Sequence, residues 1–139
     1  MQTNYNRGSA FERQLKKKYE AAGYSVHRMA GSHSPIDLIA ISSEELMLIQ
    51  CKSSTTELLP NVKQLLKTTS IDEVRTKVNG QWMKVKQEGK SNVKLLEEMQ
   101  VPDNTTKLIV WKGKGRENYY SFYWKSLSDT WKGKKGLAI

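Results

Sequence analysis

The sequence predicts an α/β fold in which helices flank a central β-sheet. A helical segment near the N-terminus precedes three short strand-like segments, and a second helical segment precedes two more. This order is typical of helices packed on one sheet. The expected strands cover residues 24–29, 36–41, 46–53, 106–112 and 119–124. A chain of 139 residues has the length of about one domain, so we expect a single domain over residues 1–139.

The first helix is expected over residues 9–22. The run from Ser9 to Glu12 matches a capping box, in which a serine and a glutamate satisfy the first backbone N–H groups of a helix. From helix chemistry alone, Glu12 would therefore be structural. The helical spacing of apolar residues ends at Gly23, and its members are Phe11, Leu15, Tyr19 and Ala22.

The middle of the chain gives a weaker pattern. Residues 61–69 and 71–78 have apolar side chains at helical spacing, although glycines interrupt them. A better-defined helix is expected over residues 92–100, capped by Ser91. Residues 132–136 are expected to form a frayed basic tail after the last strand.

Composition narrows the class of partner. A formal net charge of +9 and a pI near 9.6 favour a polyanion such as nucleic acid over a membrane surface or a small-molecule substrate. No segment approaches the roughly 20 apolar residues of a membrane span, and the N-terminus lacks an apolar signal core, so we expect a cytoplasmic protein. One cysteine and two histidines cannot form a Cys/His zinc cage, so a catalytic metal would need oxygen ligands.

One polar cluster is expected on two adjacent strands. Asp37 interrupts an apolar segment, and Gln50, Cys51 and Lys52 lie in the next strand. Because side chains alternate along a strand, Gln50 and Lys52 share the face where Asp37 can meet them, and Cys51 points into the core on the other side. Lys52 alone would fit an edge-strand gatekeeper.

These residue types suit phosphodiester cleavage. Magnesium prefers a few hard oxygen ligands and keeps several waters, so Asp37, the Gln50 side chain and the Cys51 carbonyl would be enough protein ligands. Lys52 could orient the attacking water and stabilise the phosphate. The cluster therefore predicts a nuclease centre that uses Mg²⁺, with Mn²⁺ as a substitute.

Four ordered motifs carry a family resemblance: RGSAFER at 7–13, RMAGS at 28–32, PIDLIA at 35–40 and IQCK at 49–52. Together they resemble the archaeal-type Holliday junction resolvases of the PD-(D/E)XK nuclease superfamily. The resemblance implies a restriction-endonuclease-like fold, with a mixed central sheet flanked by helices. It also implies resolution of four-way DNA junctions by paired symmetric nicks.

The resemblance also implies residue roles. The catalytic positions are Glu12, Asp37, Gln50, Lys52 and Ser32. The metal is held by Asp37, Gln50, Glu12 and the backbone carbonyl of Cys51. The resemblance implies DNA contacts by Arg13, Arg28 and Ser32, although Ser32 would by default be a turn residue, and we also expect Arg7 and Lys17 to contact DNA. Because a four-way junction has near two-fold symmetry and needs two nicks, a homodimer is expected.

Gln50 stands where this family has a glutamate. The amide keeps the shape but removes a negative charge, so metal affinity should fall. Either this lineage works with glutamine, with Glu12 carrying more of the ligation, or a glutamate was replaced to give an inactive form. Two other functions therefore stay open: a restriction or repair endonuclease of the same superfamily acting on linear duplex, and a DNA-binding module with a weakened centre.

The C-terminal part, residues 106–139, interleaves cations with aromatic residues. This pattern suits single-stranded nucleic acid, whose bases stack on aromatic rings. The segment 119–124 is aromatic on both faces, however, as a buried or dimer-forming strand would be. We expect these aromatic residues to serve the core and an interface.

Overall fold

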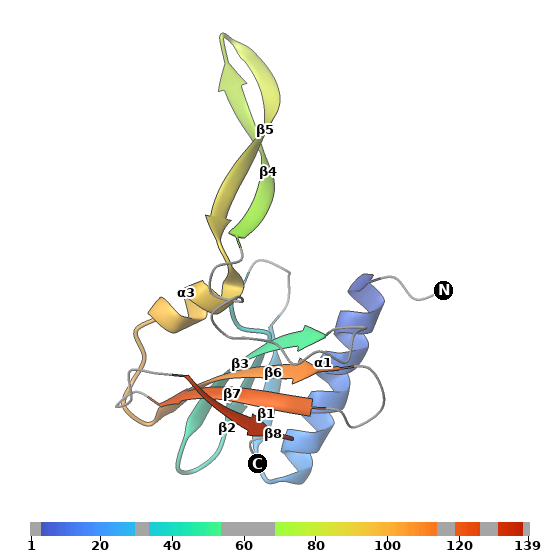
Figure 1. The fold of residues 1–139 in the computed structure, drawn as a ribbon, viewed down its shortest axis with the longest axis vertical. Coiled ribbons are helices and arrows are strands. Elements are labelled where there is room, and N and C mark those ends of the chain that lie inside the picture. The colour runs from blue at the N-terminus through green and yellow to red at the C-terminus, as the bar shows by residue number, and fades with distance from the viewer. Residues whose placement is uncertain (1–3, 30–33, 54–68, 114–118, 126–130, 138–139) are drawn as a thin grey trace.

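The computed structural model describes residues 4–29, 34–53, 69–113, 119–125 and 131–137. Within these residues the main body is a six-stranded sheet in the order β1-β2-β3-β6-β7-β8, and a separate two-stranded hairpin, β4–β5, extends from it (Figure 1). The strands are β1 (Ser25–Arg28), β2 (Leu38–Ile41), β3 (Leu46–Ser53), β4 (Thr69–Val78), β5 (Gln81–Lys90), β6 (Thr105–Lys112), β7 (Tyr119–Lys125) and β8 (Lys132–Lys135). The described helices are α1 (Asn4–Ala21) and α3 (Asn92–Glu98).

The main sheet is mixed. β3 and β6 run parallel, and every other neighbouring pair in this sheet is antiparallel. Seven of the eight residues of β6 are buried, as expected for a central strand covered on both faces. The predicted fold class, a mixed central sheet flanked by helices, is confirmed.

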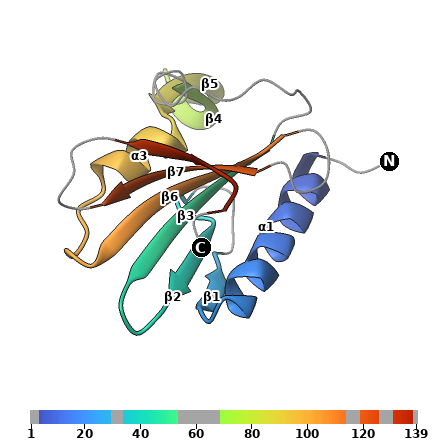
Figure 2. The same ribbon diagram turned by 60° about the horizontal axis from the view of Figure 1, so that its bottom comes forward.

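Two apolar cores lie on opposite faces of the sheet, because successive side chains of β3 and β6 alternate between them. The residues Met47, Ile49, Leu108 and Val110 pack in the core beneath α1. The intervening Leu48 and Ile109 pack in the core beneath α3. Figure 2 shows the two helices on opposite sides of the sheet.

The α1 core also takes up the first aromatic residue of β7. Tyr119 is buried and its ring stacks on Phe11 of α1, with 6.1 Å between the ring centroids. Phe122 is buried in the α3 core. The expected core role of the β7 aromatics is therefore confirmed for these two residues, and the expected interface role stays a prediction.

The predicted start of the first helix was wrong. α1 begins at Asn4, so Ser9 lies within the helix and does not cap it. The Ser9 hydroxyl has a tertiary partner instead: it accepts a hydrogen bond from Nη2 of Arg28 over 2.9 Å. The predicted end is confirmed, because α1 stops at Ala21 and Gly23 has the positive φ (100°) of a helix C-terminus. No helix in the described part of the chain is long and apolar enough to cross a bilayer.

The helical pattern predicted over 71–78 was also wrong, because this segment is β4. Its partner β5 is joined through Asn79 (φ 49°) and Gly80 (φ 82°), and positive φ at both positions is the signature of a type I′ turn. The predicted segment 61–69 falls almost entirely outside the described residues. The helix expected at 92–100 is confirmed as α3, with the Ser91 hydroxyl accepting from the backbone N–H of Lys94.

The frayed basic tail predicted at 132–136 was wrong as well, because this segment forms the edge strand β8. Its backbone pairs with β7, and the Ser121 hydroxyl donates to the Gly136 carbonyl over 2.7 Å. Gly133 packs closely, since a Cβ there would lie 2.7 Å from the Tyr120 hydroxyl and the Tyr120 side chain would have to shift. The exposed lysines of β8 place charge on a sheet edge, which hinders pairing with other chains.

Candidate active site

Asp37 lies at the point where the chain enters β2. The sequence placed it inside a strand over 36–41, but β2 begins two residues later than predicted, at Leu38, so Asp37 lies just before the strand. Its backbone is nevertheless fixed on both sides: its N–H donates to the Ile49 carbonyl over 2.8 Å, and its carbonyl accepts from Met29 N–H over 2.9 Å. These bonds hold the Asp37 side chain beside the second half of β3.

One oxygen of Asp37 accepts two hydrogen bonds from β3. Oδ2 accepts from the backbone N–H of Cys51 and from Nε2 of Gln50, each over 2.8 Å. Burial raises the pKa of Asp37, the Cys51 N–H opposes that shift, and the nearby negative charge of Glu12 adds to it. The carboxylate is therefore held partly out of water and next to a second acid.

Gln50 is almost completely buried, with 3% of its surface exposed. Its Nε2 also donates to the Cys51 carbonyl, over 3.3 Å, so this nitrogen contacts two of the oxygens that were predicted to hold a metal. The other polar atom of its side chain, Oε1, is buried without a hydrogen-bond partner among the described residues. The structure thus brings Asp37, Gln50 and the Cys51 carbonyl together.

These oxygens fit a hard divalent ion, because Asp37 Oδ2 and the Cys51 carbonyl converge on one point. The nitrogen of Gln50 lies at that point, and its hydrogens supply the positive charge that the two oxygens require. The opposite orientation would aim Oε1 at two acceptors, so the hydrogen bonds fix the amide. To bind an ion, Gln50 must turn Oε1 toward it. A glutamate at position 50 would need no such turn.

Cys51 contributes its backbone and not its thiol. Its side chain packs against the α1 core, as predicted, and burial raises its pKa well above the ordinary value. A thiol that resists ionisation is a poor metal ligand. Among the described residues there is no group of three or more His, Cys, Asp or Glu side chains suited to an ion, so main-chain and amide oxygens would have to complete the set.

Glu12 lies nearby but pairs with Arg28. The Arg28 guanidinium donates to Glu12 Oε2 from Nη2 over 2.9 Å and from Nε over 3.3 Å. The same guanidinium holds Ser9, so one arginine of β1 fixes two side chains of α1. Sequence spacing gives no signal for this group of three residues, because tertiary packing brings α1 and β1 together here.

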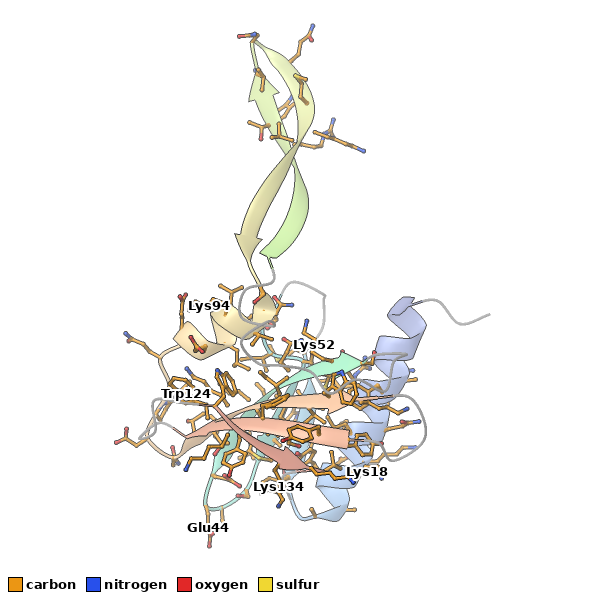
Figure 3. All side chains as sticks on the ribbon, in the orientation of Figure 1. Lys18, Glu44, Lys52, Lys94, Trp124 and Lys134 are labelled. Atoms are coloured by element: carbon orange, nitrogen blue, oxygen red, sulfur yellow. The ribbon has the colours of Figure 1, made fainter. Side chains whose placement is uncertain are left out.

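The other predicted site residues are placed less closely. Lys52 is half-buried on β3, and its positive charge offsets a small part of the rise that burial causes in the pKa of Asp37. In Figure 3, Lys52 lies at the end of the body from which the hairpin leaves. Arg13 and Lys17 are exposed on α1. Ser32 and the side chain of Arg7 lie outside the described part of the structure.

Comparison with known proteins assigns the family. Residues 3–113 match the family model described as archaeal Holliday junction resolvase (Hjc). The chain belongs to this family. The resolvase family recognised from the four sequence motifs is therefore confirmed, and the motifs at 7–52 lie within the matched region.

One curated protein and two solved structures are similar to this chain. The chain is 40% identical over 75 residues to the crossover junction endodeoxyribonuclease Hjc of Methanocaldococcus jannaschii, which is 53% of this chain and 56% of the relative. The chain thus spans about half the length of that curated relative. The Hjc structure from Archaeoglobus fulgidus is 14% identical with a TM-score of 0.47, covering 91% of this chain and 85% of the other. A bacterial homing endonuclease is also 14% identical, with a TM-score of 0.48 and coverage of 87% and 69%.

Proposed function

We propose that this chain is a metal-dependent endodeoxyribonuclease that resolves four-way DNA junctions by paired symmetric nicks. The observation that carries the proposal is the convergence of Asp37 and the Cys51 carbonyl at Gln50, on the strand that also bears Lys52. Membership of the resolvase family supports the choice of a branched substrate. We place this reaction in the cytoplasm, where such DNA would be encountered.

Three oxygens would hold the ion: Asp37 Oδ2, the Cys51 carbonyl and, after rotation of the amide, Gln50 Oε1. Magnesium, or manganese in its place, would supply an activated water and neutralise charge on the phosphate when bound. Lys52 presents an ammonium beside this group, where it can hold a phosphate oxygen and orient the water. Water attacks phosphorus and the bond to the 3′ oxygen breaks, which leaves 5′-phosphate and 3′-hydroxyl ends.

Arg28 and Glu12 have a positioning role in this proposal. Their ion pair ties α1 to β1 next to Asp37 and keeps a second carboxylate close to it. The overall charge of +9 favours binding to the phosphate backbone, so affinity should fall steeply as salt increases. Two nicks at symmetric positions require two centres, which a homodimer with two-fold symmetry supplies.

The test compares a labelled four-way junction with a linear duplex made from the same arm sequences, each incubated with Mg²⁺ or Mn²⁺. We expect paired nicks in the junction and little cutting of the duplex, and we expect Asp37→Ala to abolish both. Equal cutting of the two substrates would favour the restriction or repair alternative.

A second candidate function rests on the Gln50 amide. Because its nitrogen occupies the point where the oxygens converge, this chain could bind junctions with a weakened nuclease centre. This candidate would be favoured over the enzyme by two results together. The chain binds the junction tightly, and neither Mg²⁺ nor Mn²⁺ supports any cutting that the Asp37→Ala substitution abolishes.

A further inference from the structure

The β4–β5 hairpin forms an arm that leaves the body along the longest axis of the molecule (Figure 1). Each strand has 10 residues, and all ten cross-strand pairs from Thr69↔Lys90 to Val78↔Gln81 are in register. At about 3.4 Å per residue, such an arm reaches roughly 30 Å. We call residues 69–90 the arm.

The outer half of the arm has two chemically different faces. Residues that pair directly across the strands share a face, so Arg75 and Lys84 lie on the same side as Lys77 and Trp82. The other side carries Thr76, Met83, Val78 and Val85. No aspartate or glutamate occurs between residues 75 and 85, and every residue in this range is exposed. One face of the arm is therefore a basic strip with a tryptophan near its tip.

The exposure of this surface indicates a contact role. Trp82 is 64% exposed and Met83 is 52% exposed, although the two cores of the body take up most large apolar side chains. A two-stranded hairpin alone is marginally stable in water. A hairpin that projects from the body and exposes cations and an aromatic ring to solvent is suited to binding another molecule.

We propose that the arm is a second DNA-contact element, in which Arg75, Lys77 and Lys84 bind phosphates of one duplex arm of the substrate. This inference rests on the proposed function for its choice of DNA. The major groove of a duplex admits a two-stranded β-ribbon, and roughly 30 Å corresponds to about nine base pairs at 3.4 Å each. Trp82 lies on the same face as these three cations and can contact the same duplex.

The position of the arm agrees with this role. Along the vertical axis of Figure 3, Lys52 lies on the side of the body nearest the arm, and Lys134 and Glu44 lie toward the opposite end. A duplex whose backbone reached Lys52 would therefore lie toward the end from which the arm projects. One continuous duplex could therefore contact both Lys52 and the cations of the arm.

A second copy of this chain is the competing occupant, through the face with Met83 and Val85. Net charge disfavours it, because Arg75, Lys77 and Lys84 lie on the opposite face but still give each outer arm three cations and no acid. Two such arms would repel each other, whereas a polyanion complements them.

The experiment compares two charge-matched triple variants. One removes the arm cations (Arg75→Ala, Lys77→Ala, Lys84→Ala). The control removes three exposed lysines of β8 (Lys132→Ala, Lys134→Ala, Lys135→Ala). Binding of a labelled four-way junction is measured in EDTA, so that no cutting occurs, over 50–300 mM salt. Circular dichroism melting checks that the body of each variant is folded.

We expect the arm variant to bind at least tenfold more weakly. Its slope of log K against log salt should also be shallower by two to three, since each lost phosphate contact removes about 0.9. The β8 variant should change the slope by less than one. An unchanged slope in the arm variant, or an equal loss in both variants, overturns the proposal.

Two further measurements separate this proposal from its rivals. If Met83→Glu lowers the molar mass in sedimentation while the arm variant binds DNA normally, the arm is a contact between copies and the proposal is wrong. The proposed function fails separately: wild-type protein that binds the junction but does not cut it in Mg²⁺ or Mn²⁺ refutes the enzyme and leaves the arm result standing.

Discussion

Replacing Gln50 with glutamate should convert a site in which the Gln50 amide nitrogen binds the neighbouring oxygens into one that depends on an ion. The wild-type amide donates to Asp37 and to the Cys51 carbonyl, and the substitution replaces both donors with a second buried carboxylate. We therefore expect Gln50→Glu to destabilise the protein in EDTA at pH 7 and to be stabilised strongly by Mg²⁺.

The size of the effect follows from the geometry. Two ionised carboxylates at the 2.8 Å of the present contact would repel by about 6 kcal/mol at an effective dielectric constant near 20. Binding a proton is less costly: holding a carboxyl of pKa about 4.3 neutral at pH 7 costs about 4 kcal/mol. The shared proton restores part of the lost hydrogen bond, so the net loss should be about 2–4 kcal/mol, or roughly 10 °C in Tm.

The loss should depend on pH in a defined direction. The folded-state pKa of the new pair is raised above that of the unfolded chain. Its stability is therefore complete below about pH 4.3 and is lost as the pH rises through the raised pKa. At pH 5 the cost of the proton is only about 1 kcal/mol, so the variant should approach the wild type.

The assay is thermal and denaturant unfolding at pH 5 and pH 7, in EDTA and in 10 mM Mg²⁺. An ion present at a hundred times its Kd adds about 2.7 kcal/mol, which should restore most of the stability of Gln50→Glu at pH 7. Gln50→Met is the matched control, since it removes the donors without adding charge and should show neither dependence. We also expect the nuclease activity of Gln50→Glu in Mg²⁺ to equal or exceed that of the wild type.

Two results would refute the reasoning. One is a Gln50→Glu variant that is as stable as the wild type in EDTA at pH 7. The other is a wild type that gains as much from Mg²⁺ as the variant does. Either result would show that the amide nitrogen does not occupy the ion's position.

Three other substitutions test further features of the structure. Tyr19→Phe should keep or raise stability by up to about 1 kcal/mol, because the buried hydroxyl has no partner among the described residues. Burial also raises the pKa of Tyr19, so ionisation of the unfolded tyrosine should lower the stability of the wild type above about pH 10, and Tyr19→Phe should lack this loss. A larger loss of stability above about pH 10 in Tyr19→Phe than in the wild type would contradict this. Gly80→Ala should lower the protection of the arm amides in hydrogen exchange by about 1 kcal/mol without lowering the Tm of the body, because the turn needs a positive φ at this position. Asn79→Gly is the control and should leave the protection unchanged. Equal protection in the two variants would argue against the type I′ turn. A double-mutant cycle between Arg28→Ala and Glu12→Ala should give a coupling of about 1 kcal/mol in unfolding, and additive losses would contradict the ion pair.

Much of the sheet could be predicted because its strands carry their own pattern. β3 was predicted with its observed bounds, since its apolar run and polar end both fall within one segment. The β4 segment resembles a helix in sequence, because Ile71, Val74 and Val78 fit helical spacing as well as a hairpin. The local signal for a hairpin is the Asn79-Gly80 pair that follows. β8 had no local signal, because its backbone bonds to β7 are what make it a strand.

The candidate site was predictable in its members and not in its geometry. The motifs identified Asp37, Gln50 and Cys51, and the structure places their atoms in contact. The direction of the Gln50 amide depends on which acceptors surround it in three dimensions, so no spacing rule could give it. The pairing of Arg28 with Glu12 likewise depends on how α1 lies across β1.

The parallel pairing of β3 with β6 has an evolutionary consequence. Parallel neighbours cannot be joined by a tight turn, so a long connection separates β3 from β6 in the sequence, and its described part contains β4, β5 and α3. The arm is carried on this detour, between two strands whose register is fixed by each other. A lineage can therefore lengthen, shorten or exchange this attachment while the β3–β6 pairing and the contacts of Asp37 with Gln50 and Cys51 stay as they are.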